Sequence, residues 1–194
     1  MALGFTPFAL EVHENAKAHG WWDSTRDLNE VFALMHSELS EALEEARADR
    51  PMVWLGEGGK PEGIAVELID CIIRCLDFAG MHIGSLDGED ITFEESMENC
   101  PEHLYKGESV GGLINRMHNY LASTFKDRVL PAYHASPDDK DYDELLASMV
   151  SGVLALSSII LCWCRENGVE DPIALMLKKH EYNKSRPYKH GKKF

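Results

Sequence analysis

Apolar residues recur at intervals of three and four along most of the chain, which is the spacing of an amphipathic α-helix. The pattern predicts helices over residues 7–19, 27–48, 61–80, 108–128, 142–167 and 171–185. Between them we expect a glycine- and proline-rich loop at 51–63, which overlaps the approximate start of the third helix, an irregular acidic stretch at 84–107, a loop at 131–139 and a loosely held basic tail at 190–194. No segment alternates convincingly between apolar and polar residues. We therefore predict an all-α fold, a bundle of about six helices in a single domain over residues 1–194.

The helix predicted over residues 61–80 carries its polar residues in an unusual arrangement. In the segment AVELIDCIIRCLD, residues 65–77, apolar side chains cover most of the helical circle. The ionisable residues share one narrow stripe and comprise Glu67, Asp70, Arg74 and Asp77. A helix that lies on a core needs only an apolar stripe, so this pattern predicts a helix that is buried nearly all round and holds carboxylates inside the protein.

The helix predicted over residues 27–48 carries a second acidic pair, Glu38 and Glu41, which point the same way because they are three residues apart. If the two helices pack as an antiparallel pair, these residues can converge with Glu67 and Asp70. Four unpaired anions in a helical interior would be severely unfavourable, and Arg74 could neutralise only part of the charge. Hard divalent cations prefer oxygen ligands, so the four acids predict a Mg²⁺ site. The alternative interpretation is a solvated row of charges.

A di-iron carboxylate bundle is the nearest chemical rival of a Mg²⁺ site. Such bundles use Glu-x-x-His pairs. None of the nine histidines has a glutamate three residues before it, so the sequence disfavours iron.

The two acidic motifs resemble a known signature. ExxE at 38–41, followed by ExxD at 67–70, is similar to the pattern of the all-α nucleoside triphosphate pyrophosphohydrolases, the MazG-like superfamily. HENAKAHGWWD at 13–23, KPEGIAVELID at 60–70 and EYNKSRPYKHGKKF at 181–194 also resemble small MazG-like proteins. The resemblance covers about residues 8–80 and 171–194. It implies Mg²⁺-dependent hydrolysis of a nucleoside triphosphate, a dNTP above all, to the monophosphate and pyrophosphate, with Mn²⁺ able to replace Mg²⁺.

The resemblance also implies roles for single residues. Glu38, Glu41, Glu67 and Asp70 would bind the metal, and Glu38 or Glu41 would act as the catalytic base if a separate base is needed. The tail helix would supply contacts to the phosphates or the base from Lys179, Asn183, Lys184 and Arg186. Trp22 and Asn15, with Trp21 and His13 beside them, would border the base pocket. For the two tryptophans, packing in the core is an equally good interpretation.

Residues 82–170 depart from compact family members, in which the tail follows soon after the ExxD helix. They faintly echo the first half of the chain: His36 aligns with His118 at an offset of 82 residues, and Gly84 aligns with Gly168 at 84. Residues 1–83 would then be an acidic-motif hairpin and 84–170 a degenerate repeat that has lost the acids, or else an insertion. The family implies a homo-oligomer, a dimer, although an internal repeat could complete the bundle within one chain.

Charge and composition limit the classes of partner and the cellular location that we expect for this protein. The net charge of −14 disfavours a nucleic-acid polymer, but a small nucleotide can be held through a metal ion. Residues 145–164 carry no charge and are long enough for a bilayer span, but their four serines and one glycine favour a buried core helix and no membrane. The five cysteines show no zinc pattern, and the first residues show no secretory signal, so we expect free thiols and a cytoplasmic protein. The alternative function is a catalytically inactive helical module that binds nucleotides or a protein.

Overall fold

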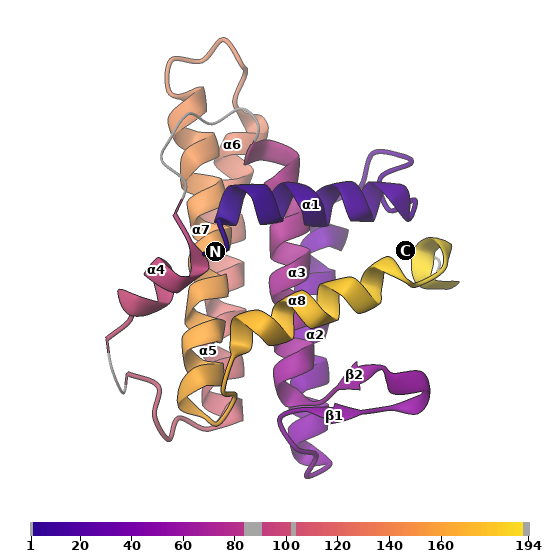
Figure 1. Cartoon of the computed structure of the whole chain (residues 1–194). Coiled ribbons are helices and arrows are strands. Elements are labelled where there is room, and N and C mark those ends of the chain that lie inside the picture. The colour runs from indigo at the N-terminus through magenta and orange to yellow at the C-terminus, as the bar shows by residue number, and fades with distance from the viewer. Residues whose placement is uncertain (1, 84–90, 102–103, 192–194) are drawn as a thin grey trace.

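The computed structural model describes residues 2–83, 91–101 and 104–191, and most of them are helical (Figure 1). The long helices correspond to the six predicted segments, with ends that differ by about four residues or fewer. They are α1 (Phe5–Ala18), α2 (Leu28–Arg47), α3 (Ile64–Ile83), α5 (Val110–Thr124), α7 (Tyr142–Glu166) and α8 (Pro172–Lys184). The predicted all-α bundle is confirmed.

Polar side chains begin several of these helices at the expected places. The Asp27 side chain accepts a hydrogen bond from the backbone N–H of Asn29 and caps α2. Asp171 caps α8 in the same way through the N–H of Ala174, and Pro172 occupies the first turn, where it lacks only an N–H that the helix does not need. These caps explain why the predicted and observed starts agree.

Two predicted loops contain regular structure. In the loop predicted at 51–63, β1 (Trp54–Leu55) and β2 (Pro61–Glu62) form an antiparallel pair around the short turn η1 (Glu57–Gly59). In the stretch predicted to be irregular, α4 (Phe93–Glu98) begins at Thr92, which exchanges hydrogen bonds with Glu95 in a capping box. Both corrections concern short elements, which period-based prediction detects poorly.

The loop predicted at 131–139 begins later than expected. After α5 the backbone passes through the π-helical turn η2 (Phe125–Val129) into α6 (Leu130–His134). Pro131 stands in the first turn of α6, a position that tolerates proline, so it does not end the helix there.

The chain just before its basic end contacts the segment that follows α1. The turn η3 (Tyr188–Gly191) contacts the end of α1, because the Lys189 N–H donates to the His19 carbonyl at 2.9 Å and the Tyr188 hydroxyl bonds to Asp23. These contacts are made just before the basic tail predicted at 190–194, so the expectation of a loosely held tail stays a prediction. Residues 192–194 lie outside the described residues.

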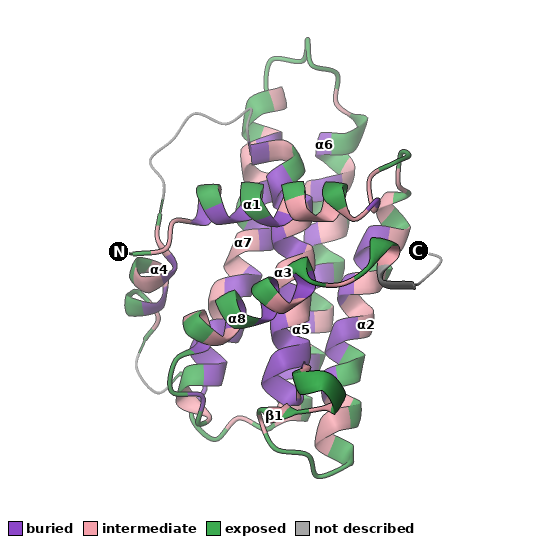
Figure 2. Ribbon diagram, turned by 45° about the vertical axis from the view of Figure 1, so that its right-hand side comes forward, coloured by how far each residue is buried: buried purple, intermediate pink, exposed green. Residues whose placement is uncertain are grey.

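Helix α3 is the centre of the molecule. It packs against α1, α2, α7 and α8, and α1 and α8 cross one of its faces while α2 lies alongside (Figure 1). Most of its apolar residues are buried, as the sequence predicted, while Ile73 is half-buried and Met81 is exposed; Figure 2 shows burial along nearly the whole length of the helix. Gly80 lets α1 approach closely, because a Cβ there would lie 2.4 Å from the carbonyl oxygen of Ala9. The carboxylates of α3 are therefore carried by a helix that is tightly packed against its neighbours.

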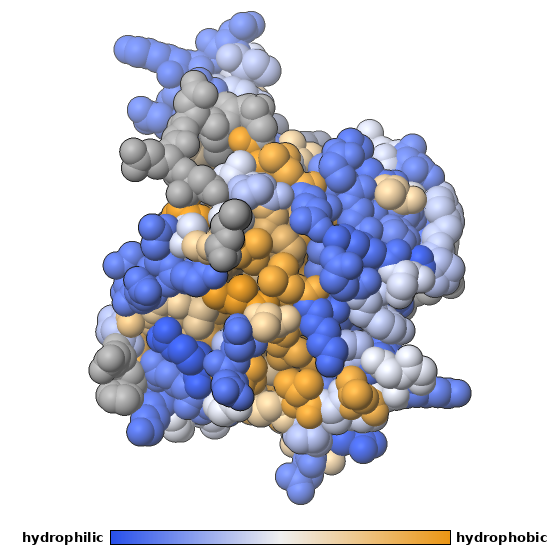
Figure 3. Space-filling view, viewed as in Figure 1, coloured by the Kyte–Doolittle hydropathy of each residue, from blue (hydrophilic) through white to orange (hydrophobic). Residues whose placement is uncertain are grey.

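Helix α7 includes the uncharged segment 145–164. Among the described helices it alone is long and apolar enough to cross a membrane by length and composition. It packs against α3, α4, α5 and α6, and its buried residues include Leu161 and Trp163. This packing agrees with a core helix, and the absence of a membrane stays a prediction. Figure 3 shows an apolar strip down the middle of the face that carries α1 and α8.

The two histidines that suggested an internal duplication lie against each other. His36 on α2 and His118 on α5 stack with ring centroids 5.0 Å apart, and their Nδ1 atoms are separated by 2.7 Å. Contact between equivalent positions is what a pseudo-twofold axis would produce. Gly84, the other anchor of the alignment, lies outside the described residues, so the division into 1–83 and 84–170 stays a prediction.

Candidate metal and nucleotide site

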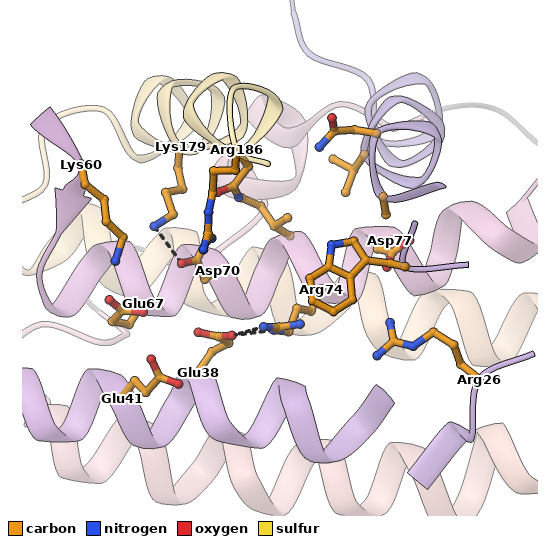
Figure 4. A pocket seen from close by; sticks show the side chains of 16 residues that line it. Arg26, Glu38, Glu41, Lys60, Glu67, Asp70, Arg74, Asp77, Lys179 and Arg186 are labelled. Carbon is orange, nitrogen blue, oxygen red and sulfur yellow. Dashed lines mark hydrogen bonds and ion pairs between the residues drawn. The ribbon is translucent and has the colours of Figure 1, made fainter. Parts of the chain in front are cut away.

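Three acids from two helices meet at the base of a cleft (Figure 4). Glu38 of α2 and Glu67 and Asp70 of α3 each offer one carboxylate oxygen, and these oxygens lie within 4.8 Å of one another. Glu38 and Glu67 are only 5% and 7% exposed. The convergence predicted for an α2–α3 pair is therefore present for three of the four acids.

The fourth acid, Glu41, lies one turn after Glu38 and lines the same cleft. It is exposed, and it does not belong to the group of three converging oxygens. Its carboxylate faces the cleft from the side (Figure 4), where it can contact a ligand or a water molecule that the other three hold.

Positive side chains neutralise only part of this charge. Arg74 Nε donates to Glu38 Oε1 at 2.6 Å, and its Nη2 lies 2.5 Å from the same oxygen. Lys179 of α8 is 1% exposed and places its Nζ 2.9 Å from Asp70 Oδ2. Neither ion pair includes Glu67, so within the described residues the most buried carboxylate of α3 forms no ion pair with a cationic side chain.

The electrostatic consequence is a protonated glutamate in the metal-free protein. Burial raises the pKa of Glu67 to about 8, the negative charges of Asp70, Glu38 and Glu41 act in the same direction, and Lys179 opposes them. Burial also raises the pKa of Glu38, against the effect of Arg74. A divalent cation among these oxygens would favour the ionised forms. Carboxylate oxygens alone form a donor set that suits Mg²⁺ or Mn²⁺, so the residues present fit the predicted metal.

The cleft above the acids has a volume of about 140 Å³ and is lined by side chains of α1, α2, α3 and α8 and of the segments beside them. Four of the residues predicted to bind substrate line it: Asn15, Lys179, Asn183 and Arg186. The Asn183 side chain is buried, and its Oδ1 has no hydrogen-bond partner. An unpaired buried acceptor is costly, so this oxygen is available to a ligand donor.

Two predicted substrate contacts lie elsewhere. Lys184 is not among the residues that line the cleft; its Nζ lies 2.5 Å from carboxylate oxygens of both Glu11 and Glu181. Trp22 lines a separate cavity of about 420 Å³, while its neighbour Trp21 lines the cleft. Lys184 lies on the side of α8 that faces α1. The sequence alone could not show which of the basic residues near the end of α8 face the cleft.

The cleft also contains two cationic residues to which the sequence analysis assigned no role, although one of them, Lys60, begins the segment KPEGIAVELID. Lys60 enters from β2's hairpin and pairs with Glu62 at 2.7 Å, and its charge also acts on Glu67 and Asp70. Arg26, just before α2, lines the cleft at the end far from the three acids (Figure 4). Their positions depend on the tertiary packing of loops, whereas Asp77 was visible in advance on the polar stripe of α3.

No family model matches the chain, and no curated protein or solved structure matches it significantly. The site is therefore interpreted from its own geometry, and the MazG-like resemblance stays a prediction.

Proposed function

We propose that this protein is a Mg²⁺-dependent pyrophosphohydrolase that converts a nucleoside triphosphate, in particular a dNTP, to the monophosphate and pyrophosphate. The observation that carries the proposal is the meeting of Glu38, Glu67 and Asp70 within 4.8 Å at the base of a cleft. Lys60 and Arg186 line the same cleft. Anionic and cationic groups on opposite walls suit a ligand that is itself a metal–triphosphate complex.

Different residues of the cleft would bind the phosphates and orient the metal ligands. Lys60, Lys179 and Arg186 would donate to phosphate oxygens, with the guanidinium able to form two parallel bonds. Arg74 would hold the Glu38 carboxylate in its present orientation through the two contacts already described. Bound Mg²⁺ or Mn²⁺ would neutralise phosphate charge and lower the pKa of a water molecule toward neutrality.

In the reaction, the oxygen of a water molecule would attack the α-phosphorus, and the bond from that phosphorus to the bridging oxygen of the β-phosphate would break. The pyrophosphate would leave with that oxygen and its electron pair. Glu41 is the better candidate to accept the proton of the water, because it is exposed in the cleft while Glu38 is engaged by Arg74.

The test is to incubate the purified chain with Mg²⁺ and each of the common NTPs and dNTPs and to measure pyrophosphate and monophosphate. Asp70→Asn and Glu41→Gln should each lower the rate by about 100-fold or more. Glu44→Gln is the matched control, because Glu44 is an exposed glutamate of the same helix that pairs with Arg47 outside the cleft. Rates in Asp70→Asn and Glu41→Gln equal to the rate of the unmodified chain would refute the mechanism.

An inactive helical module is the competing function, since the segment 84–170 lacks the acids. Binding of a nucleotide without release of pyrophosphate in Mg²⁺ or Mn²⁺ would favour it. The expected cytoplasmic location and dimeric state belong to the same proposal, and the mass of the purified protein in solution tests the second of them.

A further inference from the structure

Residues 185–191, which follow α8, lie against the end of α1, and we call them the C-terminal strap. The Lys189 N–H of this strap donates to the His19 carbonyl at 2.9 Å. The strap also carries Arg186, one of the cationic residues that line the cleft. The contacts that fix the strap on α1 therefore also fix the point at which this arginine enters the cleft.

The His19 side chain links the strap to α1 through both of its ring nitrogens. Nδ1 lies 2.8 Å from the carbonyl oxygen of Asn15, which is one turn earlier in the chain, and Nε2 lies 3.0 Å from the carbonyl oxygen of Arg186. Asn15 and Arg186 both line the cleft. A single imidazole ring therefore bridges the backbones of two cleft residues that come from opposite ends of the chain.

Both partners of this ring are hydrogen-bond acceptors. A backbone carbonyl oxygen cannot donate, so each of the two contacts requires a proton on the histidine nitrogen. Neutral imidazole carries one N–H and would set the lone pair of its other nitrogen against a carbonyl oxygen. Only the imidazolium form donates to both oxygens. The observed bridge therefore matches a positively charged His19, and hydrogen bonds from a charged donor are stronger than neutral ones.

The charged groups of the neighbouring segments form pairs of their own. These pairs are Glu14 with Lys17 on α1, Lys184 with Glu11 and Glu181 between α8 and α1, and Asp23 with the Tyr188 hydroxyl between the α1–α2 turn and the strap. Histidine is the side chain that ordinarily changes charge between about pH 5 and 8. The other histidines of these segments, which would affect the wild type and a His19 variant alike, are His13 on α1, His180 on α8 and His190 in the strap.

We propose that His19, in its imidazolium form, is a positioning residue that holds Arg186 at the cleft, so that phosphates bind more tightly when His19 is protonated. Either neutral tautomer places a lone pair against one of the two carbonyl oxygens, so the bridge is lost whichever nitrogen gives up its proton. The inference rests on the proposed function in one respect, namely the assignment of Arg186 to the phosphates of the substrate.

The first experiment measures the Kd of inorganic tripolyphosphate for the full chain by calorimetry at about pH 6 and about pH 8.5. Ca²⁺, which takes the same kind of oxygen ligand, replaces Mg²⁺. Glutamine has a single side-chain nitrogen, so we expect His19→Gln to raise Kd by about 10-fold at the lower pH, as for a lost charge-assisted hydrogen bond. At the higher pH the wild type has also lost its second donor, and the two values should agree within about twofold.

Two further variants show whether the effect is specific. His134→Gln replaces an exposed histidine of α6 and should leave Kd unchanged at both pH values. In an Arg186→Gln background, His19→Gln should have no further effect, because a residue that acts only through Arg186 is not additive with it.

A measurement on the ring itself separates this inference from the proposed function. Nitrogen-15 NMR of the histidine side chains shows which ring nitrogens carry protons and requires no substrate. At about pH 6 we expect both ring protons of His19 to exchange with water about 10-fold more slowly than those of His134, because both are hydrogen-bonded.

The outcomes distinguish the two proposals. Slow exchange of both His19 ring protons and a pH-dependent effect of His19→Gln, in a chain that releases no pyrophosphate from any nucleotide, would refute the hydrolysis and leave the bridge intact. Three results would overturn the inference: exchange as fast as in His134, a loss of affinity that is the same at both pH values, or an equal loss in the Arg186→Gln background.

Discussion

Replacement of Glu67 by glutamine should stabilise the metal-free protein at alkaline pH, although it removes a predicted metal ligand. Glu67 is buried among other acids, and its pKa is raised from 4.5 to about 8. Because the folded-state pKa lies above the unfolded value, the unfolded chain releases its proton first as the pH rises. The destabilisation by Glu67 is therefore absent below about pH 4.5, increases between about 4.5 and 8, and is complete above 8. Glutamine cannot ionise and so avoids it.

The size of the effect follows from the same values. The difference of 3.5 pH units (8 − 4.5) corresponds to at most about 5 kcal/mol, at about 1.4 kcal/mol for each unit. Water in the open cleft screens part of this interaction, so we expect about 2 kcal/mol in the free energy of unfolding. For a chain of this length, that is a rise of about 4–8 °C in the melting temperature.

The assay is urea unfolding of wild type and Glu67→Gln, followed by circular dichroism, with EDTA at about pH 5 and about pH 8.5. Glu67→Gln should gain stability over wild type mainly at the higher pH. Saturating Mg²⁺ should reverse the order, because a bound ion at 100 times its Kd stabilises wild type by about 2.7 kcal/mol and the variant by less. A difference between the proteins that is the same at both pH values and unchanged by Mg²⁺ would refute the reasoning. Glu44→Gln is again the exposed control.

Three further predictions test the packing of the helices, the lysines of α8 and the cap of α2. Gly80→Ala should destabilise the fold by about 1–3 kcal/mol in urea, since the new Cβ would meet the Ala9 carbonyl at 2.4 Å; an unchanged midpoint would contradict the close approach of α1. Lys179→Met should lower the rate of pyrophosphate release by about 10-fold or more, whereas Lys184→Met should leave it nearly unchanged; equal losses would place both lysines at the substrate. Asp27→Ala should lower stability by about 1 kcal/mol through loss of the α2 cap, and full stability would show that α2 needs no cap.

Much of the fold follows from the sequence because most of its helices are long and strongly periodic. The apolar pattern of α3 predicted both its burial and the stripe that holds Glu67, Asp70 and Asp77. The short elements α4 and β1 were missed, since six or two residues carry little periodic signal. The capping box at the start of α4, formed by Thr92 before the helix and Glu95 in its first turn, was the available local clue.

Helical spacing alone predicted only the acids that share a helix, whereas the family resemblance supplied the other predicted residues that line the cleft, Asn15, Lys179, Asn183 and Arg186. Spacing along α2 and α3 predicted the acids, and simple pairing of the two helices brings Glu38 to Glu67. No local pattern distinguishes Trp21 from Trp22, and Arg26 reaches the cleft only because the α1–α2 turn folds its guanidinium against both rings. Contacts of this kind depend on how loops pack, and a single sequence does not encode them as a period or a motif.

The position of α8 has a consequence for the protein while it is being made. Asp70 can fold against α2 early in translation, but Lys179, its partner, follows 109 residues later (179 − 70). In a nascent chain that has reached only α7, Asp70 lacks the lysine with which it pairs in the folded protein. The charge balance of the three-acid cluster is therefore completed only after the last long helix has been synthesised and has packed against α3.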